Sequence, residues 1–151
     1  MGCPNEGVLR RNFGAPALAY QVFISHGWHD RWVAKRMAQL IQGVGGVPFI
    51  DIFDIKKGDK IEEKIHFGLD QATELVALLT PWSIERNWVW SEIAAAWAMR
   101  KRFVGVMYGL TIEEIEKNRG GMAVLGPTNV IAIDSFDDYL VELSERIRAG
   151  T

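Results

Sequence analysis

Residues 74–97 read ELVALLTPWSIERNWVWSEIAAAW and contain the transition that decides the fold. The first seven residues are a short apolar run, whose length suits a strand that is buried on both faces. After Pro81, apolar residues such as Ile93 and Trp97 recur at helical spacing, and Asn87 is a candidate N-cap. The stretch therefore predicts a strand that is followed directly by a helix.

The same alternation continues along the chain. Five apolar runs predict strands, and they read AYQVFIS, VPFID, ELVALLT, RFVGVMY and NVIAI. Helical spacing links the apolar residues Val33, Met37, Leu40 and Ile41, then Ile61, Ile65 and Leu69, and finally Phe136, Tyr139, Leu140, Leu143 and Ile147. Capping-box spacing is found for Asp59 with Glu62 and for Thr111 with Glu114. Strands that are apolar on both faces and alternate with helices predict a five-stranded parallel sheet covered on both sides, which is a flavodoxin-like three-layer α/β domain.

Composition limits the classes of protein to consider. A chain of 151 residues that is 48 % apolar suits one compact domain, expected over residues 18–151 after a flexible arm at 1–17. Seventeen basic and nineteen acidic residues give no broad attraction to nucleic acid or to an anionic membrane. The single cysteine, Cys3, has no partner for an internal disulfide, and no signal peptide or membrane-spanning run is evident. We expect a cytoplasmic protein.

The candidate site lies where the predicted strands end, because parallel sheets bind ligands beyond the carboxyl ends of their strands. The strand ends and following loops supply Ser25, His26, Gly27, Asp51, Trp82 and Tyr108. Trp88 and Glu92 are four residues apart and therefore share one helix face. An acid beside an aromatic wall suits a charged ring or a sugar. The alternative is a solvated acid next to a tryptophan at the rim of the sheet.

Two other combinations of residues are weaker candidates for a functional site. His26, His29 and Asp30 lie close together, but no further histidine, cysteine or acid falls at ligand spacing, so we expect neither a metal nor a resident cofactor. Ser25 and His26 are adjacent on a strand and point to opposite faces, which rules out a nucleophile paired with its base.

Four segments in order give the chain a family resemblance. YQVFISHGWHD resembles the first-strand box of bacterial Toll/interleukin-1 receptor (TIR) domains, and FIDIFDIKKGDKIEEKI resembles their second strand, BB loop and following helix. TPWSIERNWVWSEI resembles the exit of their third strand and the helix that bears the functional glutamate, and the tail from RFVGVMYGLT fits in pattern. The resemblance covers about residues 18–148. The phenylalanine-tryptophan box of animal receptors is absent, with Ser135, Phe136 and Asp137 near its place.

TIR domains either assemble receptor complexes or cleave the nicotinamide-ribose bond of NAD. The spacing of Trp88 and Glu92 matches the enzymatic branch. The resemblance implies that Glu92 is the main catalytic residue, that Trp88 lines the nicotinamide-ribose pocket, and that NAD+ is the substrate. The products would be nicotinamide and ADP-ribose or a cyclic ADP-ribose signal, with Tyr108 influencing the choice. The resemblance also implies self-association through the BB loop, at Asp54, Lys56, Lys57 and Gly58.

Bacterial proteins of this kind often serve antiphage defence. A protein complete at 151 residues would produce a signal for a separate effector, as in Thoeris-type systems, whereas an excised fragment would depend on its fused domain. Two alternatives stay open: a non-catalytic TIR–TIR interaction module, and an enzyme similar to nucleoside deoxyribosyltransferases. Comparing NAD, NADP and free nucleosides as substrates separates the second alternative.

Overall fold

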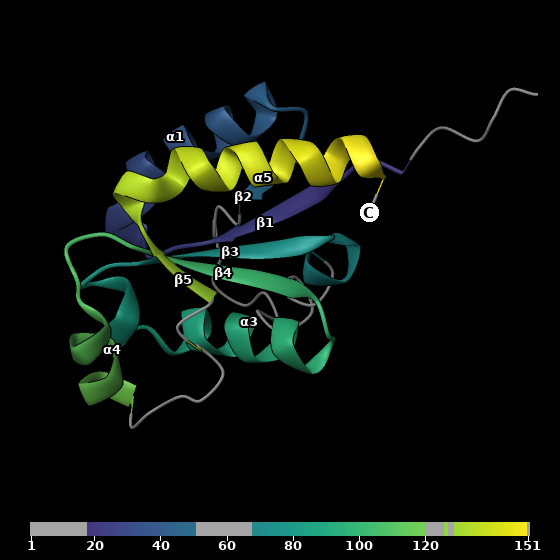
Figure 1. Ribbon diagram of the computed structural model, residues 1–151. Coiled ribbons are helices and arrows are strands. Elements are labelled where there is room, and N and C mark those ends of the chain that lie inside the picture. The colour runs from purple at the N-terminus through teal and green to yellow at the C-terminus, as the bar shows by residue number, and fades with distance from the viewer. Residues whose placement is uncertain (1–17, 51–67, 120–125, 127–128, 151) are drawn as a thin grey trace, which may run out of the picture.

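The chain forms a five-stranded parallel sheet of the order β2-β1-β3-β4-β5 (Figure 1). The computed structural model describes residues 18–50, 68–119, 126 and 129–150. The strands are β1 (Gln21–Ser25), β2 (Val47–Ile50), β3 (Glu74–Leu79), β4 (Arg102–Met107) and β5 (Val130–Ala132). This order and the parallel pairing confirm the predicted flavodoxin-like arrangement. The predicted arm at 1–17 lies outside the described residues.

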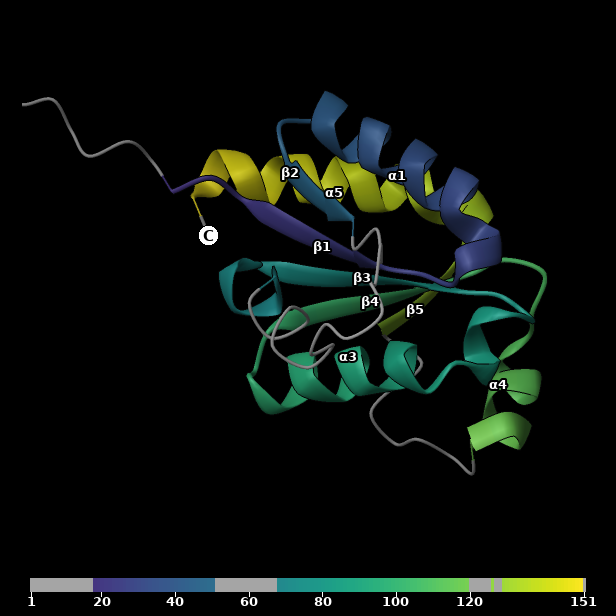
Figure 2. The ribbon, with the colours of Figure 1, turned by 180° about the vertical axis from the view of Figure 1, so that it is seen from behind.

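Helices cover both faces of the sheet, as Figures 1 and 2 show from opposite sides. The longer helices are α1 (Arg31–Gly43), α3 (Asn87–Ala98), α4 (Ile112–Arg119) and α5 (Phe136–Ala149). The described residues also form the single-turn 3-10 helices η1 (Trp28–Asp30), η2 (Ser83–Glu85) and η4 (Ile133–Ser135). Residues 68–71 are helical, and the rest of the helix predicted around Ile61 and Ile65 lies outside the described residues.

The sheet separates two apolar layers. Alternation along β1 turns Val22 and Ile24 toward α1 and α5, while Phe23 faces the layer beneath α3. All six residues of β3 are buried, as expected for the central strand of a covered sheet. The predicted inner face of α5 is confirmed: Phe136, Tyr139, Leu140 and Leu143 are buried, and Ile147 packs against them.

Three helix starts were predicted from capping residues. The Thr111 and Glu114 pair is a capping box, because the Thr111 N–H donates to Glu114 Oε2 (2.8 Å) and the Glu114 N–H donates to Thr111 Oγ1 (3.3 Å). Asn87, however, is the first residue of α3, and the extended Arg86 takes the N-cap position. The predicted cap was therefore wrong by one residue. Asp59 and Glu62 lie outside the described residues.

Trp97 does not share the buried face of Ile93, although the two residues have helical spacing. Its side chain is 59 % exposed, although Ile93, four residues earlier, is fully buried. Ala96 takes the sheet-facing position in the last turn of α3, and successive helix residues are about 100° apart, so Trp97 turns away from the sheet. Trp90 is the buried tryptophan, and its Nε1 donates to the Ile84 carbonyl (2.7 Å), which ties α3 to η2.

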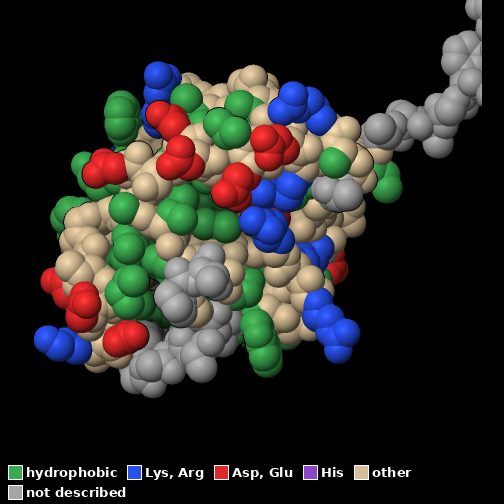
Figure 3. Space-filling view, viewed as in Figure 1, with side chains coloured by type: hydrophobic (Ala, Val, Ile, Leu, Met, Phe, Trp, Pro, Cys, Tyr) green, Lys and Arg blue, Asp and Glu red, His purple; other side chains and the backbone are tan. Residues whose placement is uncertain are grey.

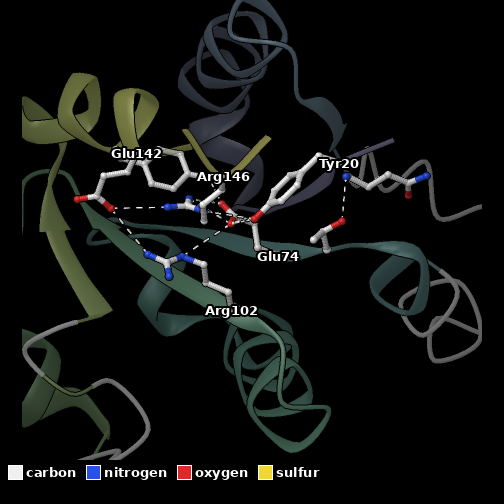
Figure 4. Close-up of polar contacts among 8 residues, drawn as sticks. Tyr20, Glu74, Arg102, Glu142 and Arg146 are labelled. Carbon is white, nitrogen blue, oxygen red and sulfur yellow. Dashed lines mark hydrogen bonds and ion pairs between the residues drawn. The ribbon is translucent and has the colours of Figure 1, made fainter. Parts of the chain in front are cut away.

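A buried ion-pair cluster, which we call the Glu74 cluster, closes the amino end of the sheet (Figure 4). Glu74 is fully buried at the start of β3 and accepts hydrogen bonds from the hydroxyls of Tyr20 (2.7 Å) and Tyr139. Arg146 Nη2 lies 3.2 Å from Glu74 Oε2 and Arg102 Nε lies 3.8 Å away. On this face of the molecule, acidic side chains lie along α5 and a small basic group lies beside them (Figure 3). The cluster compensates a buried charge that would otherwise destabilise the fold.

Candidate active site

A buried polar network joins the loops that follow β1 and β3 at the carboxyl edge of the sheet. Thr80 Oγ1 donates to Asp30 Oδ2 (2.6 Å) and accepts from the Ser83 N–H (3.1 Å). Ser83 Oγ in turn donates to the Leu78 carbonyl (2.8 Å) and accepts from the Thr80 N–H (2.8 Å). Thr80 and Ser83 are fully buried and Asp30 nearly so. We call these three residues the loop joint, because they fix η1 against η2.

The tight fit at the loop joint explains why a glycine occurs there. A Cβ at Gly27 would lie 3.3 Å from Asp30 Oδ2 and 3.4 Å from Ser83 Cα. The approach to Asp30 Oδ2 is tighter than most Cβ contacts, so a side chain at position 27 would need a small shift of the Asp30 carboxylate. Gly27 therefore leaves little room for a side chain between the two loops.

Burial shifts the pKa values of two titratable groups at this edge in opposite directions. Desolvation raises the pKa of Asp30, against the hydrogen bond from Thr80 and the nearby charges of His26 and His29, which lower it. Desolvation lowers the pKa of His26, against its contact with the Ile24 carbonyl and the charge of Asp30. A neutral imidazole is therefore favoured at position 26 near neutral pH.

Glu92 lies in the layer between α3 and the sheet. Its side chain is 1 % exposed. Val89 and Ile93, which lie near it on the same helix, pack in the apolar layer between α3 and the sheet. Trp88, one turn earlier, is partly buried against the same core, and the Arg86 guanidinium lies 5.6 Å from its ring centroid. The predicted pairing of an acid with an aromatic wall on one helix face is thus consistent with α3, and the alternative of a solvated Glu92 is excluded.

Ser25 faces the same layer as Glu92. It follows Phe23 by two residues on β1 and pairs in register with Ala77, and both of these belong to the core beneath α3. The Ser25 side chain is 1 % exposed, and its hydroxyl has no hydrogen-bond partner among the described residues. Most buried side-chain polar groups have a hydrogen-bond partner, so the Ser25 hydroxyl is unusual.

The remaining predicted residues occupy the rim. Trp82 is 53 % exposed at the start of η2, and Tyr108 is 48 % exposed beyond β4, held there by its N–H bond to the Leu79 carbonyl (2.9 Å). Gly109 follows with a φ of 72°, a conformation that favours glycine. Tyr108 and Trp82 therefore border the carboxyl edge without belonging to the core.

Part of the predicted site lies outside the described residues: Asp51 and the BB-loop residues Asp54, Lys56, Lys57 and Gly58. Within the described ranges, no three histidine, cysteine, aspartate or glutamate side chains group as a metal site would require. A search of those same ranges found no helix long and apolar enough to cross a membrane.

Sequence reasoning missed the loop joint. It placed Asp30 with His26 and His29 as a weak metal candidate, whereas the Asp30 carboxylate bonds to Thr80. The available signal was the polar pair Thr80 and Ser83 around Pro81, directly after an apolar strand. Buried hydroxyls at such a position need partners, and the loop after the neighbouring strand is where one would be found.

The chain belongs to the TIR domain family, whose model matches residues 22–144. Among curated proteins, it is 28 % identical over 144 residues to the 2' cyclic ADP-D-ribose synthase BtTIR of Bacteroides thetaiotaomicron, covering 92 % of this chain and 50 % of that protein. It is 22 % identical over 134 residues to the NAD(+) hydrolase PdTIR of Paracoccus denitrificans, covering 85 % of this chain and 44 % of the relative. The chain thus spans about half the length of these relatives.

Solved structures agree on the fold. The TIR domain of the Toll-related receptor TRR-2 from Hydra magnipapillata superposes with a TM-score of 0.61 at 15 % identity, covering 87 % of this chain and 98 % of that one. The TIR domains of the activated Roq1 resistosome superpose with a TM-score of 0.54 at 18 % identity, covering 87 % and 79 % of the two chains.

Proposed function

We propose that this protein is a TIR-type NAD+ glycohydrolase or ADP-ribosyl cyclase, which cleaves the bond between nicotinamide and ribose. The observation that carries the proposal is the buried Glu92 carboxyl group one turn after Trp88, on the helix that follows the central strand. The curated relatives named as a 2' cyclic ADP-D-ribose synthase and an NAD(+) hydrolase support it.

The chemistry needs no proton donor for the leaving group. The glycosidic C–N bond breaks with its electron pair going to the pyridinium nitrogen, so nicotinamide departs as a neutral base and leaves an oxocarbenium-like ribose. Glu92 stabilises the positive charge that develops on the sugar and holds the ribose hydroxyls. Such stabilisation is strongest where water is excluded, which the burial of Glu92 favours.

The neighbouring residues take supporting roles in this proposal. Trp88 lines the pocket for the nicotinamide and its ribose. The buried Ser25 hydroxyl forms a hydrogen bond with a polar group of the substrate. His26 and Gly27 shape the loop after β1. Asp51, which lies outside the described residues, is a further proposed substrate contact.

The product depends on what reaches the oxocarbenium carbon. Water adds to it, releases a proton to solvent and gives ADP-ribose. If the adenosine part of the same molecule folds back first, one of its own nucleophilic groups attacks and the product is a cyclic ADP-ribose species. Tyr108, half exposed beyond β4, is placed to influence this choice by stacking.

We further propose that the domain self-associates through the BB loop and acts in bacterial antiphage immunity, where its product activates a separate effector. Structural likeness to the TIR domains of an assembled resistosome is consistent with assembly. The defence role rests on the family resemblance and is a prediction for infection assays of cells with and without the protein.

Chromatography of NAD+ incubated with concentrated protein tests the proposed reaction. We expect the unmodified protein to release nicotinamide and Glu92→Ala to release at least a hundredfold less. Glu85→Ala is the matched control, because Glu85 is an exposed acid seven residues earlier on η2. Equal nicotinamide release by the two variants, with both folded by circular dichroism, would contradict the catalytic role of Glu92. No release by the unmodified protein or by Glu85→Ala, even at high protein concentration, would favour a non-catalytic TIR–TIR interaction module.

A further inference from the structure

Exposed tryptophans gather at the carboxyl edge of the sheet. Trp28, in η1, is 58 % exposed, and Trp82, which directly precedes η2, is 53 % exposed. Trp32, in the first turn of α1, is 74 % exposed. Tryptophan is costly to leave in water, and exposed tryptophans in one region commonly mark a binding surface. The hydrogen bonds of the loop joint explain how the buried side of these loops is stabilised. They do not explain why tryptophan side chains are exposed on the outer side.

The loop joint fixes Trp28 and Trp82 on neighbouring turns. Trp28 follows Gly27 and Trp82 precedes Ser83, and a Cβ at Gly27 would lie 3.4 Å from Ser83 Cα. The rings of His29 and Trp82 are in contact, with centroids 5.9 Å apart. The first turn of α1 and the start of α3 lie at the same end of the sheet in Figure 2. Two tryptophans that begin far apart in sequence therefore border one surface.

The charges around this surface are suited to a nucleotide. The Arg31 guanidinium lies 4.2 Å from the Trp28 ring centroid and Nη1 donates to the Trp28 carbonyl (3.1 Å), which places a cation directly beside an aromatic face. The nearest acid in the sequence, Asp30, points inward to Thr80. Glu85 is an exposed acid on η2. Aromatic faces bind bases by stacking, and a guanidinium binds phosphate.

We propose that Trp28 and Trp82 form an adenine-nucleotide subsite, in which the base stacks on an indole and Arg31 contacts a phosphate. This inference rests on the proposed function, because it assigns the adenosine half of NAD+ to the rim while the nicotinamide half lies at Trp88 and Glu92. A site that extends from η1 and η2 to the first turns of α3 follows the carboxyl edge, where parallel sheets bind nucleotides.

Binding of ADP tests the subsite without any turnover. Isothermal titration calorimetry of the full chain with ADP is expected to show binding that Trp28→Ala and Trp82→Ala each weaken about tenfold or more. Trp82→Phe keeps an aromatic face and is expected to retain most of the affinity. Trp97→Ala is the matched control, because Trp97 is equally exposed (59 %) but lies at the other end of α3. Circular dichroism melting confirms that each variant is folded.

Turnover then distinguishes the subsite from the reaction itself. Nicotinamide release from NAD+ is expected to show a raised KM in Trp28→Ala and Trp82→Ala with kcat little changed. ADP binding without NAD+ cleavage would remove the proposed function and keep the subsite. Cleavage with unchanged KM and unchanged ADP affinity in both variants would overturn the subsite. So would a loss that disappears at higher protein concentration together with a changed sedimentation coefficient, because the tryptophans would then mediate contact between copies of the chain.

Discussion

Thr80 Oγ1 and Asp30 Oδ2 are 2.6 Å apart, and this buried hydrogen bond connects the two loops that bear most of the candidate site. On one side lie Ser25, His26 and Gly27 after β1. On the other side η2 leads into α3, which carries Glu92, and the Trp90 Nε1 bond to the Ile84 carbonyl fixes η2 to that helix. The position of Glu92 relative to β1 therefore depends on a short chain of buried polar contacts.

Thr80→Val should weaken this connection. Valine has the shape of threonine but neither donates to Asp30 nor accepts from the Ser83 N–H, so we expect a loss of about 2 kcal/mol in the free energy of unfolding. Urea denaturation measures the loss, and the rate of nicotinamide release should fall as well. Thr80→Ser keeps the hydroxyl and should restore both values.

Thr73→Val is the control for that substitution. Thr73 Oγ1 accepts a hydrogen bond from the Gln21 N–H (3.2 Å) at the opposite, exposed edge of the sheet. We expect it to change stability by less than about 0.5 kcal/mol and to leave activity unaltered. Equal effects of the two threonine substitutions would contradict a special role for the loop joint.

His26 should make the fold sensitive to acid. Burial lowers its pKa below the ordinary 6.5, so the folded state binds fewer protons than the unfolded state in the interval between the two values. Stability from this residue is complete above pH 6.5 and is lost as the pH falls through the lowered folded pKa. His26→Asn should therefore lose less stability than the unmodified protein on acidification from pH 7, as measured by urea denaturation at several pH values. An unchanged slope would contradict burial as the cause.

Asp30 should affect the pH dependence of stability in the opposite direction to His26. Burial raises its pKa above the ordinary 3.8, so the protonated form is favoured on folding. Its contribution to stability is complete below pH 3.8 and is lost as the pH rises through the raised folded pKa. Asp30→Asn keeps an acceptor for Thr80 without this titration, and we expect it to flatten the fall in stability above pH 3.8. A steeper fall in the variant would be inconsistent with the raised pKa.

Arg146→Met should destabilise the Glu74 cluster. Glu74 would stay fully buried with Arg102 as its remaining cation at 3.8 Å, and removing one partner of a buried ion pair costs about 3 kcal/mol or more. Thermal unfolding by calorimetry measures the change. Arg148→Met on the exposed side of the same helix is the control and should be nearly neutral. A neutral Arg146→Met would mean that Tyr20, Tyr139 and Arg102 suffice to hold the carboxylate.

Specific activity should rise with protein concentration if assembly through the BB loop completes the site. Nicotinamide release per molecule, measured over a hundredfold range of protein, is expected to increase steeply and then level off. Sedimentation velocity over the same range should show a matching shift to larger species. Constant specific activity in dilute protein would contradict a requirement for assembly.

The sequence predicted the layered sheet correctly because its strands are apolar on both faces and its helices are amphipathic. Phe23 and Ile24, for example, are both buried although they face opposite layers. The Thr111 capping box was equally readable, because both partners are local. Local patterns of this kind depend little on the rest of the chain.

Long-range contacts could not be predicted in the same way. The partners of Glu74 come from positions 20, 102, 139 and 146, and Asp30 meets Thr80 across 50 residues. The order of the strands and the packing of α5 and η1 on the sheet bring these groups together. An acid that begins an apolar strand therefore indicates only that a partner is needed, not which residue it is. The exposure of Trp97 could not be predicted either, because helical spacing does not say which of several apolar residues in the last turns of α3 faces the sheet.

The rate of nicotinamide release by Glu92→Gln is the most direct test of the account. Glutamine has nearly the shape of glutamate but no charge, so the variant removes the proposed stabilisation of the oxocarbenium-like ribose with little change in packing. We predict a fall of about 10²- to 10³-fold in kcat with a folded protein and ADP still bound at the rim. Turnover within a few-fold of the unmodified protein would contradict the catalytic role of Glu92.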